Sequence, residues 1–285
     1  MNKSQGLRRR TVLSAVLTAT TLTAYGGMPL QLPKPLLDDE SARLHQMRFV
    51  LLGEVHDNPV QHSMRAAILT ELLADGRPTR IVFEQMGRAN DTLIAAAARD
   101  AESVVTAGQL DRTGWGWPLH KPLIQAALNG GALILGGDLS RDEMRAIVRG
   151  GTSAVPADLR SLLDNSHWTP DDEAATQREI DAGHCGALPP SQFAGMALAQ
   201  RSRDAALAGA MLRAVGPNER VILIAGNGHV RRDLGVPRYL MAGGVADSQI
   251  ISIGYLEQSD SAAPYDSVRV TAAVSRPDPC EAFQK

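Results

Sequence analysis

Aromatic residues and cysteines are scarce in this chain of 285 residues. Phe, Trp and Tyr together make up 4% of it, and its two cysteines are Cys185 and Cys280. Since these two do not form a Cys-x-x-Cys pair, the sequence excludes a zinc ribbon and a dithiol motif of that kind. The net charge is only −2, which argues against nucleic acid as a partner. No long apolar run that would span a membrane occurs in the sequence.

Residues 1–26 are typical of an export signal. Arg8, Arg9 and Arg10 form a basic start, and the apolar stretch 12–24 is too short to span a bilayer. The stretch also resembles a twin-arginine signal, and this route and the ordinary secretory route are equally compatible with the residues. No cysteine lies near the cleavage region, so we expect an exported protein of the periplasm or cell envelope without a lipid anchor. In that compartment Cys185 and Cys280 can pair or remain free thiols.

The remaining sequence predicts a flexible leader over 27–40 and one α/β domain over 41–285. Short apolar runs alternate with helical patterns, which indicates a mainly parallel sheet flanked by helices on both faces. A helix is expected after Asn58 and Pro59, and a long one over 191–215. Residues of about 150–190 lack strand patterns and predict a small helical subdomain inserted in the domain. The predicted strands are 49–52, 80–85, 132–138, 221–225, 249–254 and 267–273.

Polar side chains follow several of these strands at the point where each ends. Residues 51–58 (LLGEVHDN) and 221–229 (VILIAGNGH) both run from an apolar strand into a glycine and then a histidine. The carboxyl ends of parallel strands meet at one edge of a sheet, where ligands bind. We therefore expect a shared site there, made of Glu54, His56, Glu84 and His229.

This set of two carboxylates and two imidazoles suits more than one chemistry. It can ligate a divalent metal ion, act as a general acid and base, or offer an imidazole to haem iron. The structural alternative is that the carboxylates cap helices or pair with arginines while the histidines pack beside them. Asp138, at the end of another strand, can likewise contribute to the site or cap the next helix.

Other residues are candidates for holding a planar ligand. Two tryptophans in a glycine-containing segment, Trp115 and Trp117, can stack on such a ligand or pack in the core. Arg231 and Arg232 can bind carboxylates such as haem propionates, or form surface ion pairs. Tyr239 is a candidate phenolate ligand, although core packing is the commoner role of such a residue. Three histidines belong to no clear pattern: His120, His167 and His184.

In combination these motifs resemble the ChaN-like haem-binding family, which is related to the Tiki proteases and the erythromycin esterases. The resemblance covers about residues 45–255. Its pieces, in order, are GEVHDN at 53–58, FEQ at 83–85, the Trp115 and Trp117 segment, GDLS at 137–140, CGALP at 185–189, AQRSRD at 199–204 and GNGHVRRDLGVP at 226–237.

The resemblance implies a haem-binding protein of the cell envelope that serves haem or iron uptake. In that family a tyrosine holds haem iron, and paired haems can lie between two subunits. The implied partners are therefore haem, a second copy of the chain in a homodimer, and an outer-membrane haem or iron receptor. Candidate contacts are His56, His229, Tyr239, Arg231, Arg232, Trp115 and Trp117. The related hydrolases imply the alternative, a metal-dependent esterase or peptidase that uses Glu54, His56, Glu84 and His229.

Overall fold

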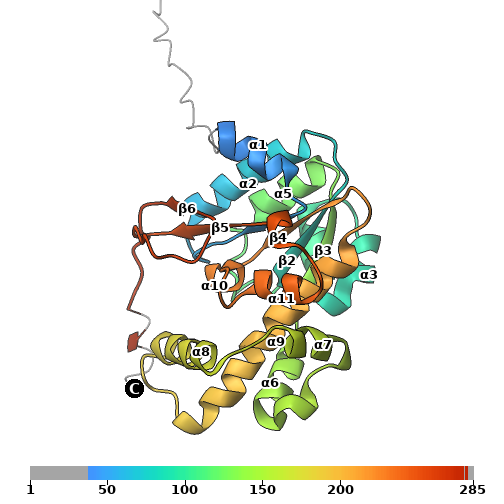
Figure 1. Ribbon diagram of the computed structural model, residues 1–285. Coiled ribbons are helices and arrows are strands. Elements are labelled where there is room, and N and C mark those ends of the chain that lie inside the picture. The colour runs from blue at the N-terminus through green and yellow to red at the C-terminus, as the bar shows by residue number, and fades with distance from the viewer. Residues whose placement is uncertain (1–37, 279, 282–285) are drawn as a thin grey trace, which may run out of the picture. The chain divides into compact units, whose positions relative to one another are not determined.

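A six-stranded parallel sheet lies at the centre of the computed structural model, which describes residues 38–278 and 280–281 (Figure 1). The strand order is β3-β2-β4-β1-β5-β6, and every neighbouring pair is parallel. The predicted α/β class with a parallel sheet is therefore confirmed. The strands are β1 (Phe49–Leu52), β2 (Thr79–Gly87), β3 (Leu133–Asp138), β4 (Arg220–Ile224), β5 (Ile250–Leu256) and β6 (Ser267–Val270).

Helices cover both faces of this sheet, because successive side chains of a strand point to opposite faces. In β1, Val50 and Leu52 pack in a core with α2 and α5, whereas Phe49 and Leu51 pack in a second core with α7, α9 and α11. The helices are α1 (Asp38–Gln46), α2 (Pro59–Leu73), α3 (Asp91–Ala96), α4 (Ala101–Ala107), α5 (Lys121–Asn129), α6 (Arg141–Gly150), α7 (Ala157–Asn165), α8 (Pro170–Gly183), α9 (Pro190–Ala214), α10 (Asn227–Val230) and α11 (Val236–Ala242).

Two helix starts near the strand tips have side-chain caps, and the one at Asn58 was predicted. The Asn58 side chain accepts hydrogen bonds from the backbone of Val60 (3.1 Å) and Gln61 (3.3 Å) at the start of α2. Ser140 and Glu143 form a reciprocal capping box at the start of α6. These caps fix where the chain turns from strand tip to helix, and both turns lie at the edge of the sheet where the site was predicted.

The segment that lacked strand patterns is helical in the structure. It contains a 3₁₀ turn (Gly151–Ala154), α7 and α8, and it leads into the long helix α9. Figure 1 shows α6, α7, α8 and α9 gathered on one side of the sheet. Close packing here uses small residues: a Cβ on Gly195 of α9 would lie 2.5 Å from the carbonyl oxygen of Val148 in α6.

The two ends of the domain differ in detail from the predictions. The predicted leader overlaps α1, which begins at Asp38, and the export signal and the rest of the leader lie outside the described residues. The last strand ends at Val270 rather than 273, because Asn58 binds the carbonyl oxygen of Ala272 with its side chain (3.0 Å) and draws the chain away from the sheet.

The two cysteines form a disulfide, which settles an alternative that the sequence left open. Cys185 lies in the turn between α8 and α9, and Cys280 lies in the C-terminal segment.

Among the helices of residues 38–278, we find none with the length and apolar character needed to cross a membrane.

Candidate functional site

The glycines that end β1 and β4 allow the two strand tips to pack against each other. A Cβ on Gly53 would lie 2.3 Å from Oδ1 of Asn227, which follows β4. A Cβ on Gly226 would lie 2.6 Å from Cε1 of His56, which follows β1. Each glycine thus makes room for a polar residue of the other strand tip, and this brings the two predicted motifs together.

Glu54 is the centre of a buried polar cluster at the tip of β1. One carboxylate oxygen, Oε1, lies 2.8 Å from Nδ1 of His56 and 3.2 Å from Nε2 of His120. The other, Oε2, contacts the guanidinium of Arg65 and lies 3.4 Å from Nδ1 of His62. Glu54, His62, Arg65 and His120 are all almost inaccessible to solvent. Glu54 is therefore a fixed acceptor that orients the half-exposed ring of His56.

Glu84 is the centre of a second buried cluster at the tip of β2. It accepts hydrogen bonds from Arg203 (2.7 Å) and from the backbone of Gly226 (2.7 Å), and it pairs with Nε2 of His229 (3.2 Å). His229 in turn binds Asp204 through Nδ1 at 2.6 Å. Arg203 extends the cluster to Asp138, with contacts of 2.6 to 3.1 Å.

The histidines of the two clusters have opposite protonation behaviour. Burial lowers the pKa of His56, of His62 to about 4 and of His120 to about 3, so these rings are neutral at neutral pH. Burial also opposes the charge on His229, but Glu84 and Asp204 outweigh it and raise the pKa of that ring to about 10. His229 is thus a cation without a free lone pair.

The carboxylate of Glu84 is stabilised as the partner of that cation. Its burial would raise its pKa, yet the charges of His229 and Arg203 hold the pKa well below the usual range. The second cluster is therefore a network in which three carboxylates are paired with two cations. The open group at the site is His56, because its hydrogen bond to Glu54 uses Nδ1 and leaves Nε2 for a ligand.

A groove of about 810 Å³ opens beside His56, at the carboxyl ends of β2 and β3. The Trp115 ring meets the ring of His56 edge to face, with centroids 4.7 Å apart. The start of α6 also lines the groove, with Arg141, Met144 and Arg145. Further lining residues are Glu84, Gln85, Met86, Asp138, Leu139 and Arg203.

The structure brings some of the predicted ligand contacts to this groove and leaves others elsewhere. His56 and Trp115 line it. Trp117 packs partly buried against the core and donates to Glu102 (3.3 Å). Tyr239, on α11, is completely buried in the second core, where burial raises the pKa of its hydroxyl. Arg232 lies in ion pairs with Asp247 and Asp266.

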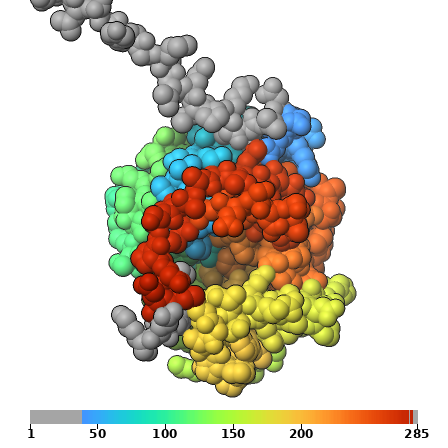
Figure 2. All heavy atoms as spheres, turned by 90° about the vertical axis from the view of Figure 1, so that its left-hand side faces the viewer, coloured from blue at the N-terminus to red at the C-terminus, as the bar shows by residue number. Residues whose placement is uncertain are grey.

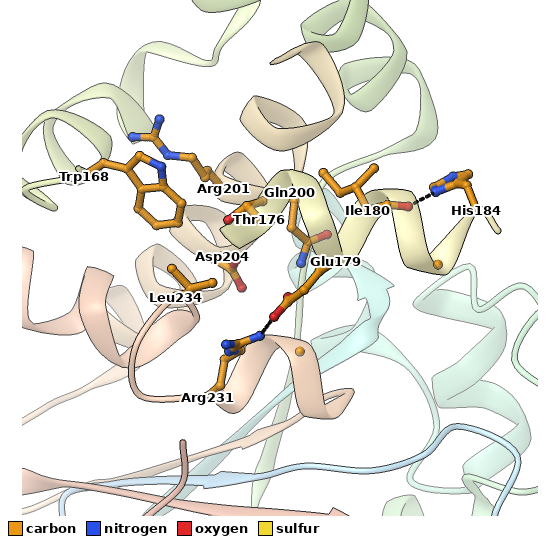
Figure 3. A pocket seen from close by; sticks show the side chains of 12 residues that line it. Trp168, Thr176, Glu179, Ile180, His184, Gln200, Arg201, Asp204, Arg231 and Leu234 are labelled. Carbon is orange, nitrogen blue, oxygen red and sulfur yellow. Dashed lines mark hydrogen bonds and ion pairs between the residues drawn. The ribbon is translucent and has the colours of Figure 1, made fainter. Parts of the chain in front are cut away.

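Arg231 lines a different cavity, of about 220 Å³, beneath α8 (Figure 3). Its guanidinium binds Asp233 and Glu179, and Figure 3 shows the Glu179 pair beside the cavity. Trp168, Arg201 and Asp204 lie on other sides of it, and His184 lies at the end of α8. The cavity therefore adjoins Asp204, the partner of His229.

The four residues predicted to share a metal do not gather around one position in the described part of the chain. The group that does offer three close ligand atoms there is Glu54, His62 and His120. Arg65, fully buried, contacts both Glu54 and His62 (3.0 Å). The charge that Glu54 needs is thus supplied by a guanidinium, and a metal ion would have to displace it.

Several residues of the two clusters were missed in the sequence. Arg65 and His62 lie in the apolar pattern of α2, and Arg203 and Asp204 lie in α9. A signal was available for the last two, because this charged pair interrupts an alanine-rich helix, and Asp204 is buried there. Nothing local distinguishes His62 or Arg65, since the carboxylate that both contact, Glu54, comes from the tip of β1.

Comparison with known proteins places the chain in a family. The family model described as haem-binding uptake, Tiki superfamily, ChaN matches residues 41–240, and no curated protein matches. A solved structure of ChaN from Campylobacter jejuni, described as showing cofacial haem binding, has 18% identity and a TM-score of 0.64, covering 81% of this chain and 89% of that chain.

Two other structures are less similar. A protein from Bacillus cereus has 15% identity and a TM-score of 0.46, over 80% of this chain and 72% of that chain. An erythromycin esterase mutant in its open conformation has 15% identity and a TM-score of 0.41, over 76% and 71%. The match of the family model over most of the domain is the decisive finding, and the chain therefore belongs to the ChaN family of haem-binding uptake proteins in the Tiki superfamily.

Proposed function

We propose that this protein binds haem in the groove beside His56, with His56 as the iron ligand, and that it serves haem or iron uptake. The observation that carries the proposal is the exposure, protonation and hydrogen bonding of the His56 ring. Its ring is half exposed toward the groove, its pKa is lowered by burial, and its Nδ1 is held by a buried carboxylate. A neutral imidazole oriented through its other nitrogen is the arrangement that metal-ligating histidines have in proteins.

The groove has the composition that a large planar ligand with carboxylates requires. Its volume of about 810 Å³ lies in the range of small-molecule sites, about 300–1,000 Å³. Trp115, Met86 and Leu139 offer apolar surface. Arg141 and Arg145 project from one face of α6, where residues four apart are neighbours. These guanidinium groups suit propionates, although Arg141 pairs with Asp111 and Arg145 with Asp142 in the free protein. They replace Arg231 and Arg232 as candidates because neither of those two lines the groove.

A bound haem would be the cargo of this site, and the chain's own residues would hold it. Glu54 keeps the Nδ1 proton of His56 in place, so that Nε2 keeps its lone pair. The rings of Trp115 and His120 pack around this part of the site, with centroids 5.9 Å apart. The buried partners of Glu54 prevent its carboxylate from turning toward the groove.

We extend the proposal to an exported protein of the periplasm or cell envelope that acts with a second copy of itself and with an outer-membrane receptor. The disulfide between Cys185 and Cys280 supports the first part, since disulfides persist in oxidising compartments. Size-exclusion chromatography with and without haemin tests the homodimer.

The first experiment is a titration of the protein with haemin, followed by visible absorption. We expect a saturable, shifted Soret band for the wild type and its loss or displacement in His56→Ala. His167→Asn is the matched control, because His167 is exposed and lies away from the groove. A His56→Ala spectrum equal to that of the wild type would remove His56 as the ligand, and a spectrum equal to that of free haemin would refute haem binding altogether.

A second candidate function is hydrolysis of an ester or peptide in the same groove. The pair of Glu54 and His56 favours it, because a neutral imidazole held by a carboxylate can act as a general base. The metal-dependent version of this alternative would need the charged ring of His229 to lose its proton. An esterase and peptidase screen of the wild type, Glu54→Gln and His56→Ala tests hydrolysis: activity that disappears in both variants would support it.

A further inference from the structure

The C-terminal segment crosses the tip of β1, next to the proposed haem ligand. Beyond β6, the hydroxyl of Thr271 accepts a hydrogen bond from Gln61 (2.9 Å), and the carbonyl oxygen of Ala272 accepts one from Asn58 (3.0 Å). The backbone of Val274 donates to Glu257 (3.2 Å). Residues 271–278, which we term the strap, are thus joined to the start of α2.

Arg276 ties the strap to the residue that follows His56. Its guanidinium binds both carboxylate oxygens of Asp57, at 2.7 and 2.8 Å. It also binds Glu257 at 2.6 and 2.8 Å. A bidentate ion pair restricts the geometry of its partner, although an exposed pair alone contributes little to stability. The strap therefore restrains the loop 53–58, which carries His56.

The other end of the strap is tied to the helical side of the molecule by the disulfide. Cys280 bonds to Cys185 directly after α8, across a sequence separation of 95 residues. Figure 2 shows the red C-terminal segment running down one side of a recess toward the yellow helices below. The disulfide thus joins two parts of the chain that border this recess.

α8 depends on such tethers because it has little apolar surface to bury. Of its 14 residues, Thr176 is the buried one. Its other connections include packing on α9, the ion pairs of Glu179 with Arg231 and of Asp172 with Arg238, and a hydrogen bond from Trp168 to Glu173. Helices with few buried apolar contacts open at a low free-energy cost. α8 covers the cavity beneath it, next to Asp204.

We propose that the disulfide between Cys185 and Cys280 is a redox latch that holds the strap over the loop 53–58 and α8 over its cavity. When it is intact, both segments are closed. When it is reduced, both are released, and the loop that carries His56 loses its restraint. The effect on haem retention rests on the proposed function, whereas the release of the two segments does not.

The chemical step is a thiol–disulfide exchange with a dithiol reductant. One thiolate of the dithiol attacks one cysteine sulfur, which forms a mixed disulfide and releases the other cysteine as a thiolate that takes up a proton. The second thiol of the reductant then displaces the first cysteine. Two electrons and two protons pass to the protein, which gains two thiols, and the reductant becomes a disulfide.

Hydrogen–deuterium exchange of the full chain without haem tests the latch itself. Oxidised protein is compared with dithiothreitol-reduced, alkylated protein and with the double variant Cys185→Ser/Cys280→Ser. We expect exchange about tenfold faster or more in peptides of 170–186 and 271–278, and unchanged exchange in β1 and β4. If the double variant folds poorly, the reduced and alkylated wild type alone provides the comparison with the oxidised protein. Unchanged exchange in both segments would overturn the proposal.

Arg276→Ala separates the strap from the disulfide, which it leaves intact. We expect faster exchange in 271–278 and in the loop 53–58, with α8 unchanged. Acceleration of α8 in this variant to the level of reduced protein would contradict a latch located at the disulfide.

Haem dissociation, measured as transfer to an excess of apomyoglobin, tests the link to the site. We expect reduction to accelerate dissociation about fivefold or more, because the loop 53–58 is released. Faster exchange with unchanged dissociation would overturn this link. Absence of any haem binding would refute the proposed function, while the exchange experiment would still decide on the latch.

Discussion

The imidazole of His56 lies in the space that a side chain on Gly226 would occupy. A Cβ at that position would be 2.6 Å from Cε1 and 2.9 Å from Nε2 of the ring. The backbone N–H of Gly226 also donates to Glu84, at 2.7 Å. One glycine therefore positions the half-exposed ring of the first cluster and contributes a hydrogen bond to the ion network of the second.

Gly226→Ala should displace His56 and weaken haem binding. We expect the affinity to fall about tenfold or more, equivalent to about 1.4 kcal/mol, and the stability to fall by about 1–3 kcal/mol from overpacking. Haemin titration and urea unfolding measure the two effects. Gly228→Ala is the matched control, because a Cβ there has no neighbour within 4 Å, and it should leave haem affinity unchanged. Equal affinities of the two variants would contradict the placement of the ligand.

Trp115→Ala and Trp117→Ala should differ although the residues are two positions apart. Trp115 lines the groove and contacts His56, whereas Trp117 donates to Glu102 and lies 5.5 Å from the guanidinium of Arg112. We expect Trp115→Ala to weaken haem binding about tenfold, through lost aromatic contact, and Trp117→Ala to leave it unchanged. The comparison is made by haemin titration, and a larger loss in Trp117→Ala would move the site away from this groove.

Tyr239→Phe should leave the haem spectrum unchanged. The Tyr239 ring is completely buried, and its hydroxyl lies beside Arg201 without a hydrogen bond of good geometry within the described residues. Removal of this hydroxyl loses at most a weak contact, so we expect the free energy of unfolding to change by no more than about 1 kcal/mol. A shifted or absent Soret band in Tyr239→Phe would instead return this tyrosine to the role that the family resemblance implies.

Stability should fall as the pH decreases from 6.5 to about 4.5. The folded-state pKa is lowered to about 4 for His62 and about 3 for His120, below the 6.5 of the unfolded chain. Within this window the unfolded chain binds protons that the folded protein excludes. Each such ring therefore lowers the free energy of unfolding by up to about 1.4 kcal/mol per pH unit as the pH falls.

The variant His120→Asn removes the contribution of His120 to this pH dependence and leaves that of His62. Urea unfolding at several pH values between 4.5 and 6.5 should give a shallower slope for His120→Asn than for the wild type. His167→Asn, which replaces an exposed histidine, should keep the wild-type slope. An unchanged slope in His120→Asn would show that this ring is accessible to protons in the folded protein.

Local patterns were sufficient to predict the strands, because each depends on its own apolar run. The expected ends of β1 agree with the structure at both residues, and those of β4 and β5 differ by one or two. Residues 271–273 were wrongly predicted to continue the last strand. Their departure from the sheet depends on Asn58 and Glu257, which bind the strap from other parts of the sequence. The pairing of Cys185 with Cys280 was undetermined for the same reason.

By itself, the sequence determined the parallel α/β class, the strand tips and the polar residues delivered there. Only the tertiary structure decided which of those residues join the cluster around Glu54 and which join the cluster around Glu84. Strand β2 lies beside β4, so Glu84 meets His229. Glu54 at the tip of β1 meets His62 and Arg65 from α2. Strand order and helix docking follow from the burial of the whole core, which no local pattern specifies. The predicted set of four is therefore divided between an ion network around Glu84 and His229 and a buried carboxylate, Glu54, that orients the half-exposed ring of His56.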